Sequence, residues 1–337
     1  MRTKKITALL CTAIFLFFSV GCAPSNVAEE PVLIKIGHTD SSTRSTHLWS
    51  VWLADYLEEN APGKFIVEVY PDGELGDTSE LIEGLKQNTV NMVFDLSSVV
   101  AAAAGPEAAC IDLPYLYPTY EDWLAGTFEN GGLELFRESI EGYGYYCIDM
   151  YYNGMRQVIS RTGIYHSPDE VEHQKVRIAR NLLNIELWKA MGAYPAPMSW
   201  GQVINALEKK QIDALDHSLG VFNDFSLHEI APYITLTNHA SSPFPIITSL
   251  AWIESLDSEL RAILEEGVHE MARRQREEER MKESEYLERF RKEGAVVEEL
   301  SKEEIAVFTQ TVQPVYDIWR EIAGDKSVEA WLATIPK

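Results

Sequence analysis

Hydrophobic and polar positions follow a repeating strand–helix order through the first part of the chain. Alternating positions predict strands over residues 32–39, 64–71 and 89–96, and apolar positions at helical spacing predict helices over 47–60 and 78–88. Strands separated by helices usually pair in parallel. This β-α-β-α-β order therefore predicts a sheet covered by helices.

The same order returns in the second half of the chain. Residues 175–180 alternate as a strand does, and a helix follows, for which Asn181 is the expected N-cap and Gly192 the residue just past the end. Arg177 and Arg180 therefore lie where a strand ends and a helix begins. In open α/β sheets, ligands bind at that edge.

A helix over residues 199–210, which Ser199 is expected to open with a capping box, and a strand over 211–218 complete the second set. Residues 79–95 align without a gap on residues 201–217, with matching apolar positions. Two similar α/β lobes that present their strand ends to each other would explain this match, and ligand sites favour such interfaces. Chance similarity between two amphipathic helix–strand units is the alternative.

The chain has 337 residues, which is long for a single core, so two lobes are expected. Residues 111–126 and 145–160 are expected to cross between the lobes or to form hinge strands. Residues 256–294 are charged and helical in pattern, which predicts one or two long helices with a solvated face. The predicted divisions are residues 33–150 for the first lobe, 151–250 for the second lobe and 251–337 for C-terminal helices.

Residues 1–22 carry the features of an export signal. Basic residues precede an apolar run over residues 6–20, which is too short to cross a bilayer comfortably, and Cys22 follows. This start resembles a bacterial lipoprotein signal, with Cys22 as the lipidated first residue of the mature chain and residues 23–32 as a polar tether. An ordinary cleaved export signal is the alternative. We expect a periplasmic or cell-surface protein that is lipid-anchored to the bacterial membrane.

Charge and motifs narrow the classes of function. The formal net charge of −23 argues against nucleic-acid binding, which needs a basic face. The sequence has no glycine-rich phosphate loop, no HExxH motif and no nucleophile elbow. His228 beside Glu229, and His269 beside Glu270, lack a further ligand in sequence. We therefore expect no metal and no cofactor.

Two cysteines, Cys110 and Cys147, lie beyond the predicted signal. Both are in apolar runs, which favours two buried thiols. A disulfide is the alternative in an oxidising compartment, because sequence alone cannot place the two residues within bonding distance.

Arg177 is the first candidate for a ligand contact. It ends a strand opposite the face that Val176 and Ile178 bury, and its planar guanidinium can hold a carboxylate through two parallel hydrogen bonds. The helix N-terminus that follows would favour the same anion. A structural ion pair is the alternative, and it applies more strongly to Arg156, which lies at a loop-to-strand junction.

Three aromatic or imidazole side chains are expected near the same rim. Trp200 lies in the first helical turn after Ser199, where it could flank a ligand or fill the core. His217 ends a strand of the second lobe, and Phe94 ends the equivalent strand of the first lobe.

Several motifs occur in a familiar order. They are "YPDGELGD" (70–77), "IDLPYLY" (111–117), "YYNGMRQVIS" (151–160), "KVRIAR" (175–180), "AYPAPMSWGQVINAL" (193–207) and "LTNH" (236–239). From about residue 33 to about residue 320, the chain resembles the solute-binding proteins of TRAP transporters, the DctP family. The resemblance implies an α/β, two-lobed fold like that of periplasmic binding proteins, with hinge strands and a long bracing helix.

The resemblance also implies a function without catalysis. Such a receptor captures a solute outside the cell membrane and delivers it to a separate permease, which an ion gradient drives. By resemblance, Arg177 is the residue that pairs with the ligand carboxylate, and Arg156 is a second pocket arginine. The other matching pocket positions are held by Thr39, Phe94, Arg180, Trp200, Asp216 and His217. Leu96 and Val99 stand where sialic-acid receptors carry Glu and Arg, so sialic acid is not expected.

From these observations we expect a monomeric receptor for a small organic acid. One alternative is a receptor for a zwitterionic solute that is amino-acid-like or ectoine-like. A second is a ligand-sensing lipoprotein that feeds a receptor kinase, because its pocket would look the same. A secreted hydrolase on a two-lobed scaffold is the competing enzyme class, and the missing nucleophile and metal motifs argue against it.

Overall fold

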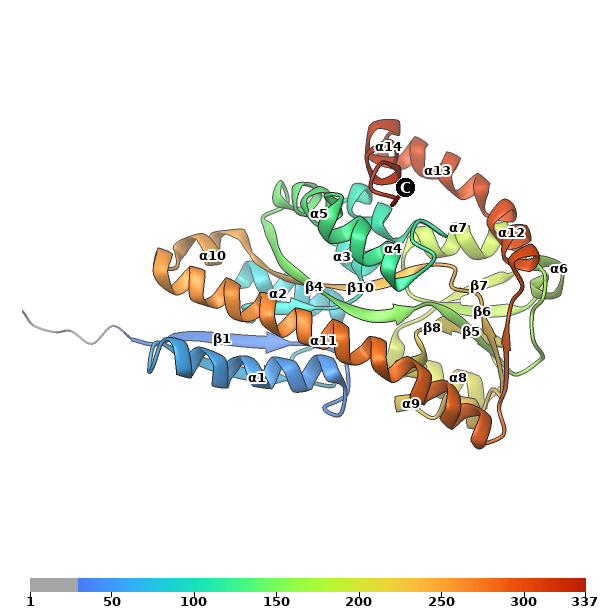
Figure 1. Ribbon diagram of the computed structural model, residues 1–337, viewed down its shortest axis with the longest axis horizontal. Coiled ribbons are helices and arrows are strands. Elements are labelled where there is room, and N and C mark those ends of the chain that lie inside the picture. Colours follow the sequence, from blue (N-terminus) through green and yellow to red (C-terminus); the bar gives the residue numbers. More distant parts are fainter. Residues whose placement is uncertain (1–29) are drawn as a thin grey trace, which may run out of the picture. The chain divides into compact units, whose positions relative to one another are not determined.

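The computed structural model describes residues 30–337, and within them the strands gather in two sheets, A and B (Figure 1). Residues 1–29, which hold the predicted signal and Cys22, lie outside the described residues. Among the described helices, none combines the length and the apolar character needed to cross a membrane.

Sheet A has the strand order β2-β1-β3-β10-β4. Its first three members pair in parallel, as the strand–helix order predicts, and the other two join them in antiparallel pairing. The bounds are β1 (Val32–Gly37), β2 (Phe65–Tyr70), β3 (Met92–Phe94), β4 (Tyr145–Met155) and β10 (Ser241–Ser249). This sheet and the helices packed on it form the first lobe.

Sheet B repeats that arrangement with β7-β6-β8-β5-β9 and adds β11 at the edge. Its bounds are β5 (Gln157–Ser160), β6 (Lys175–Ile178), β7 (Tyr194–Pro197), β8 (Ala214–His217), β9 (Tyr233–Leu236) and β11 (Val296–Glu299). The alignment of residues 79–95 on residues 201–217 matches β3 with β8. In its own sheet, each is the third of three neighbouring parallel strands. The match between residues 79–95 and 201–217 therefore reflects two sheets of the same order, and the two-lobed α/β fold is confirmed.

The chain crosses between the sheets at two adjacent places. Only Arg156 separates β4 in sheet A from β5 in sheet B, and residues 237–240 lead back from β9 to β10. The backbone N–H of Arg156 donates to the carbonyl oxygen of Ala240 at 2.8 Å, so the crossings lie side by side. Residues 145–160 thus cross as predicted. Sheet A also takes up β10, which the sequence division had assigned to the second lobe.

The second predicted crossing, over residues 111–126, is wrong. This stretch leaves the 3-10 helix η1 (Pro106–Asp112), runs through a turn and enters the short helix α4 (Tyr120–Leu124). Pro114 and Pro118 lack the backbone N–H that a strand inside a sheet must donate. The apolar residues between them fill the core instead, and Leu116 and Tyr117 are almost fully buried.

Helices cover both sheets. They are α1 (Ser45–Asn60), α2 (Thr78–Gln87), α3 (Ser97–Ala104), α5 (Gly132–Glu141), α6 (Pro168–Val171), α7 (Leu182–Ala190), α8 (Val203–Glu208), α9 (Leu219–Asp224), α10 (Leu250–Ser255), α12 (Lys302–Thr311), α13 (Gln313–Ala323) and α14 (Asp325–Leu332). Asn181 caps α7 as predicted, because its side-chain oxygen accepts from the N–H of Asn184 at 2.8 Å. The predicted capping box at Ser199 is wrong. The N–H of Gln202 donates to the backbone oxygen of Ser199, which closes a 3-10 turn ahead of α8.

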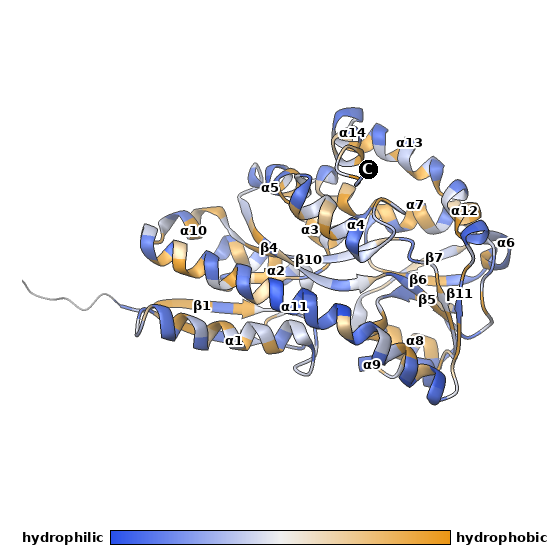
Figure 2. Ribbon diagram, in the orientation of Figure 1, coloured by the Kyte–Doolittle hydropathy of each residue, from blue (hydrophilic) through white to orange (hydrophobic). Residues whose placement is uncertain are grey.

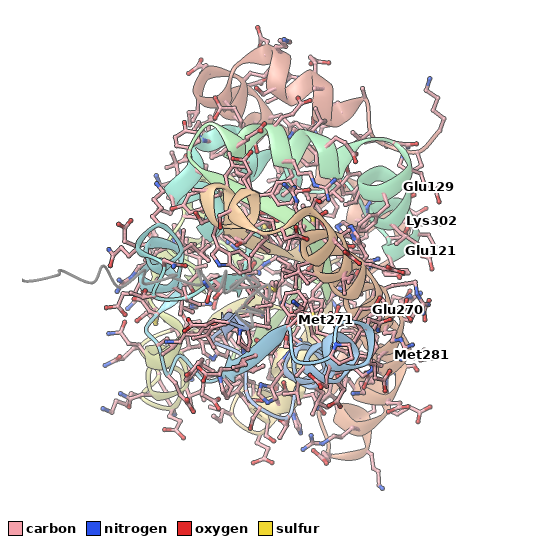
Figure 3. All side chains as sticks on the ribbon, turned by 90° about the vertical axis from the view of Figure 1, so that its left-hand side faces the viewer. Glu121, Glu129, Glu270, Met271, Met281 and Lys302 are labelled. Carbon is pink, nitrogen blue, oxygen red and sulfur yellow. The ribbon has the colours of Figure 1, made fainter. Side chains whose placement is uncertain are left out.

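One long helix, α11 (Ser258–Lys292), spans both lobes. It packs on α1 and β4 of the first lobe and on α9 of the second. Much of it is hydrophilic (Figure 2), and its apolar residues are divided between two environments. Met271 is fully buried, whereas Met281 is 67% exposed and lies with Glu270 at the outer edge of the view in Figure 3. A single helix therefore braces the lobes, as the family resemblance implied.

Both cysteines outside the predicted signal are buried free thiols. Cys110 lies in η1 and Cys147 in β4, and both belong to the apolar cluster that α13 and α14 help to cover. The interpretation of two buried thiols is confirmed.

A buried arginine ties the two lobes and the bracing helix together. Arg44, which precedes α1, has a side chain that is only 3% exposed. Its guanidinium donates to Asn153 of β4 at 2.6 Å and forms ion pairs with Asp40 at 3.2 Å, with Asp224 of α9 at 3.3 Å and with Glu279 of α11 at 3.6 Å. One cation thus compensates carboxylates from both lobes.

We predict that Arg44→Ala strongly destabilises the fold, because it leaves buried carboxylates without a cation. Breaking a buried ion pair by removing one partner costs about 3–5 kcal/mol. Lys189→Ala is the control, since its pair with Glu186 is exposed at the surface and such pairs contribute about 0–1 kcal/mol. Urea unfolding followed by circular dichroism measures both. Equal losses in the two variants would contradict a structural role for Arg44.

Candidate functional site

A cavity of about 560 Å³ lies between the two lobes. Its walls follow the carboxyl ends of six parallel strands, which is where open α/β sheets bind ligands. The residues after these ends are Thr39 and Asp40 for β1, Asp72 and Gly73 for β2, Asp95 and Leu96 for β3, Ala179 and Arg180 for β6, Met198 to Trp200 for β7, and His217 at the end of β8.

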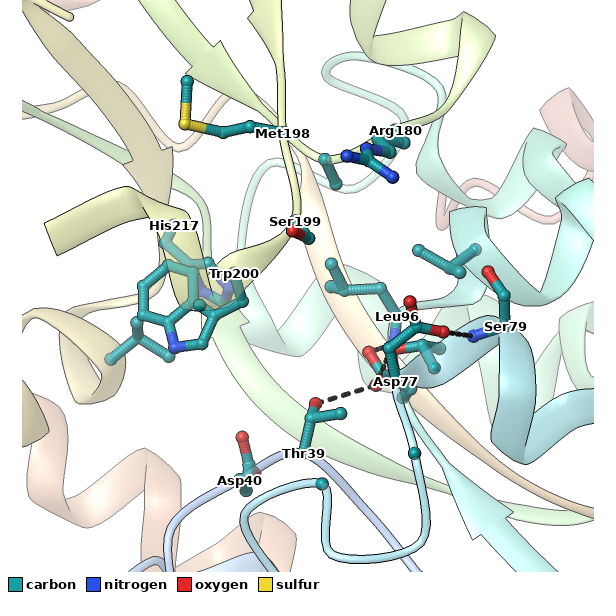
Figure 4. Close-up of a pocket in the computed structure, with 18 of the residues that line it drawn as sticks. Thr39, Asp40, Asp77, Ser79, Leu96, Arg180, Met198, Ser199, Trp200 and His217 are labelled. Carbon is teal, nitrogen blue, oxygen red and sulfur yellow. Dashed lines mark hydrogen bonds between the residues drawn. The ribbon is translucent and has the colours of Figure 1, made fainter. Parts of the chain in front are cut away.

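The two walls face each other across the cavity (Figure 4). Trp200 and His217 lie together on the wall from the second lobe, and Arg180 lies on the same wall. Thr39 and Asp77 lie on the wall from the first lobe. The cavity size falls in the usual range for small-molecule sites, about 300–1,000 Å³.

Arg177 lines this cavity as a buried cation without a carboxylate of its own. Its residue is 3% exposed, and one Nη donates to the backbone oxygen of Met198 at 2.9 Å. The other Nη and Nε have no partner among the described residues. The guanidinium carbon lies 5.3 Å from the centre of the Trp200 ring. Burial lowers the pKa of Arg177 to about 10, because the desolvation of the charge outweighs the attraction that Asp216 exerts on it from a distance.

Arg156 does not line the cavity, and neither does Asp216; the structure pairs them with each other. Nε of Arg156 donates to the Asp216 carboxylate at 2.8 Å, and one Nη donates to its backbone oxygen at 2.8 Å. The same carboxylate oxygen lies 3.0 Å from Nε2 of His239. Burial would raise the pKa of Asp216, but Arg156 and His239 outweigh it and hold this pKa well below its usual range.

His217 is neutral in this setting. Its Nδ1 accepts the backbone N–H of Ser218 at 2.9 Å, which assigns the ring proton to Nε2. Burial, with a further contribution from Arg156 and Arg177, lowers the pKa of His217 well below its ordinary value. The Trp200 ring packs edge-on against His217 and Phe225, with ring centres 5.3 and 5.1 Å apart. The site thus offers a ligand an uncharged donor and an aromatic edge.

The other predicted site residues divide between the cavity and the core. Thr39 lines the cavity and donates its hydroxyl to Asp95 at 2.9 Å. Arg180 lines it too and is exposed, with no partner among the residues that the structure describes. Phe94 is 1% exposed and stacks on His38 inside the first lobe, so it does not reach the cavity.

Sequence reasoning overlooked Asp95. It lines the cavity directly after β3 and is almost fully buried. Its position directly after a strand could have indicated a ligand contact. The chain contains many acidic residues, however, so the sequence pattern did not distinguish this one.

A possible metal-ligand group lies elsewhere. Among the described residues, His228, Glu229 and Glu293 bring three ligand atoms within 4.8 Å of one another. Glu293 already forms an ion pair with Arg289 at 3.0 Å, and none of the three lines the cavity.

Residues 36–322 match the bacterial extracellular solute-binding protein family 7, DctP. The chain belongs to this family. The resemblance drawn from the ordered motifs is therefore confirmed, and members of the family are solute receptors rather than enzymes.

Relatives whose ligand is named, and solved structures, match most of the chain. The 2,3-diketo-L-gulonate-binding periplasmic protein of Escherichia coli is 26% identical over 276 residues, which is 82% of each chain. A sugar acid binding protein from Advenella mimigardefordensis, solved in complex with galactonate, superposes with a TM-score of 0.85 at 23% identity and covers 90% of this chain and 98% of its own. A TRAP periplasmic solute binding protein from Shewanella oneidensis with bound succinate superposes with a TM-score of 0.84 at 21% identity. It covers 90% of this chain and 99% of its own.

We predict that ligand affinity is flat from about pH 6 to about pH 9 and falls above about pH 10. A bound carboxylate raises the pKa of Arg177 above its free value of about 10. Binding is therefore strongest while free Arg177 is protonated, and it weakens as the pH rises through that value. His217 stays neutral throughout this window, so it adds no transition near pH 6.5. Calorimetry at several pH values, with circular dichroism as a fold control, measures the profile. Affinity that rises as the pH falls towards 6 would contradict this profile, and repeating the titration with His217→Gln would show whether His217 is the group that takes up the proton.

Proposed function

We propose that this protein is an extracytoplasmic receptor that captures a small organic acid and delivers it to a TRAP-type permease driven by an ion gradient. In this proposal the protein performs no chemistry on the solute. The observation that carries it is Arg177, a buried guanidinium with two unpartnered nitrogens at an interlobe cavity. A desolvated cation without a counter-ion is the arrangement that an incoming carboxylate would complete.

The proposal assigns a role to each of the site residues predicted from the sequence that lie at or beside the cavity. Arg177 holds the carboxylate, and Trp200 and His217 pack against the body of the acid. Arg180 and Thr39 provide further polar contacts from the two walls. Arg156 and Asp216 act indirectly: their mutual ion pair keeps Asp216 away from Arg177. The ligands named for the relatives, a sugar acid, a diketo sugar acid and a dicarboxylate, all carry the carboxylate that this arrangement requires.

We predict that Arg177→Ala weakens binding by about thirtyfold or more. Truncating one partner of a buried charge pair costs about 2–5 kcal/mol, and each 1.4 kcal/mol is about tenfold. Arg177→Lys also loses affinity, because an ammonium cannot reproduce the guanidinium fork. Calorimetry with galactonate, 2,3-diketo-L-gulonate, succinate and the acid that mass spectrometry finds in the purified protein measures the loss.

Arg180→Ala is the matched control for this experiment. It removes the same group from the same wall, but at an exposed position, so it should cost less than Arg177→Ala. Both variants should stay folded, because the Arg177 fork has no carboxylate partner without ligand. If folded Arg177→Ala binds within about threefold of wild type, the carboxylate assignment is wrong.

We also propose that the mature protein is a monomer held at the membrane by a lipid on Cys22. The motivation is the basic start, the short apolar run and the cysteine that follows it. The wild type should partition into the detergent phase, and Cys22→Ala should remain in the aqueous phase. An intact mass without lipid, together with a wild type that stays aqueous, would indicate an ordinary cleaved signal instead.

A further inference from the structure

The two walls of the cavity differ in charge. Both arginines that line it, Arg177 and Arg180, come from the second lobe. The carboxylates that line it all come from the first lobe, and they are Asp40, Asp72, Asp77, Glu80 and Asp95. A ligand that spans the cavity therefore meets a cationic wall at one end and an acidic wall at the other.

Three of these carboxylates already have structural partners. Asp40 forms an ion pair with Arg44 at 3.2 Å and accepts a hydrogen bond from Thr46 at 2.5 Å. Asp77 caps α2, where its side chain accepts the backbone N–H groups of Ser79 and Glu80, and the Glu80 carboxylate accepts the N–H of Asp77 at 2.8 Å. None of the three needs a ligand to complete its bonding.

Asp95 is different, because it is buried and has no cation beside it. It is 5% exposed and accepts hydrogen bonds from the hydroxyls of Thr39, at 2.9 Å, and Thr78 on one oxygen. The other oxygen accepts the backbone N–H of Leu96 at 2.7 Å. No ion pair joins it to any Lys, Arg or His of the described residues. Burial raises its pKa, and these hydrogen bonds only partly offset that.

We propose that Asp95 determines which acids the receptor accepts, by taking a hydrogen bond from a hydroxyl group of the ligand and repelling a second carboxylate. The preferred ligand is then a hydroxylated monocarboxylate and not a dicarboxylate. This inference rests on the proposed function, in which Arg177 holds the first carboxylate.

The bonding of Asp95 supports this selectivity. Each carboxylate oxygen offers about two acceptor positions. One oxygen already takes two hydroxyl donors and the other takes one N–H, which leaves one position open. A ligand hydroxyl can fill it. A second ligand carboxylate has no proton to donate, and it would meet the like charge of a buried carboxylate that no cation compensates, which discriminates by repulsion.

Matched acids test this directly. Galactonate and galactarate differ only at one end, where a hydroxymethyl group is replaced by a carboxylate, and erythronate and meso-tartrate form a smaller pair of the same kind. In calorimetry, the wild type should bind the monocarboxylate of at least one pair about tenfold or more tightly than its dicarboxylate. Asp95→Asn keeps the shape of the side chain and removes its charge. The ratio of the affinity for the monocarboxylate to that for the dicarboxylate should therefore fall by about tenfold.

Glu74→Gln is the control, since it removes one charge of the first lobe from the loop between β2 and α2, at an exposed position outside the cavity. Its ratio should stay within about threefold of wild type. A dicarboxylate that binds wild type as tightly as its partner, or an unchanged ratio in Asp95→Asn, would overturn the role of Asp95 while leaving Arg177 as the anchor. If wild type binds neither member of either pair, the proposed ligand class is wrong. In that case, calorimetry of the Arg177 variants with the copurified acid tests the receptor function separately.

Discussion

The availability of Arg177 depends on the buried ion pair between Arg156 and Asp216. Without Arg156, the Asp216 carboxylate would be the nearest compensation for Arg177, whose charge it already stabilises at a distance. Arg156 and His239 hold one oxygen of that carboxylate, Oδ2, at 2.8 and 3.0 Å, whereas Oδ1 has no hydrogen-bond partner among the described residues. A buried pair of this kind is strongly destabilising to break, so it is a durable way to keep a second, neighbouring guanidinium free for a ligand.

The position of this ion pair follows from how the chain crosses between the sheets. Arg156 is the single residue between β4 and β5, and its N–H bonds to Ala240 in the return crossing. The register of β5 on β8 pairs Val158 with Asp216 and Gln157 with His217. The crossing therefore brings the guanidinium to the end of β8, where the cavity begins. The repeated strand order then sets three strand ends of each lobe around that cavity.

Much of this arrangement could be predicted from the sequence, because it depends on short-range pattern. Arg177 and Arg180 lie at the end of a strand that alternation identifies, and such positions share one edge of a sheet. Trp200 is expected at the same rim only through the predicted start of a helix at Ser199. The ion pair of Arg156 with Asp216 could not be predicted, since it joins residues 60 positions apart through one register. Phe94 shows the limit of the strand-end argument: it closes β3, yet its side chain points into the lobe interior.

Two buried arginines respond differently to any change in the angle between the lobes. Arg156 lies at the crossing itself, and its partner Asp216 is in β8, next to the strand β6 that carries Arg177, so their ion pair stays with Arg177 and preserves the anchor. Arg44, by contrast, joins Asp40 of the first lobe to Asp224 of α9 in the second. A wider angle must separate these two carboxylates or release one of them. The binding geometry is thus held within one lobe, while the energy of the Arg44 ion pairs is tied to how the lobes meet.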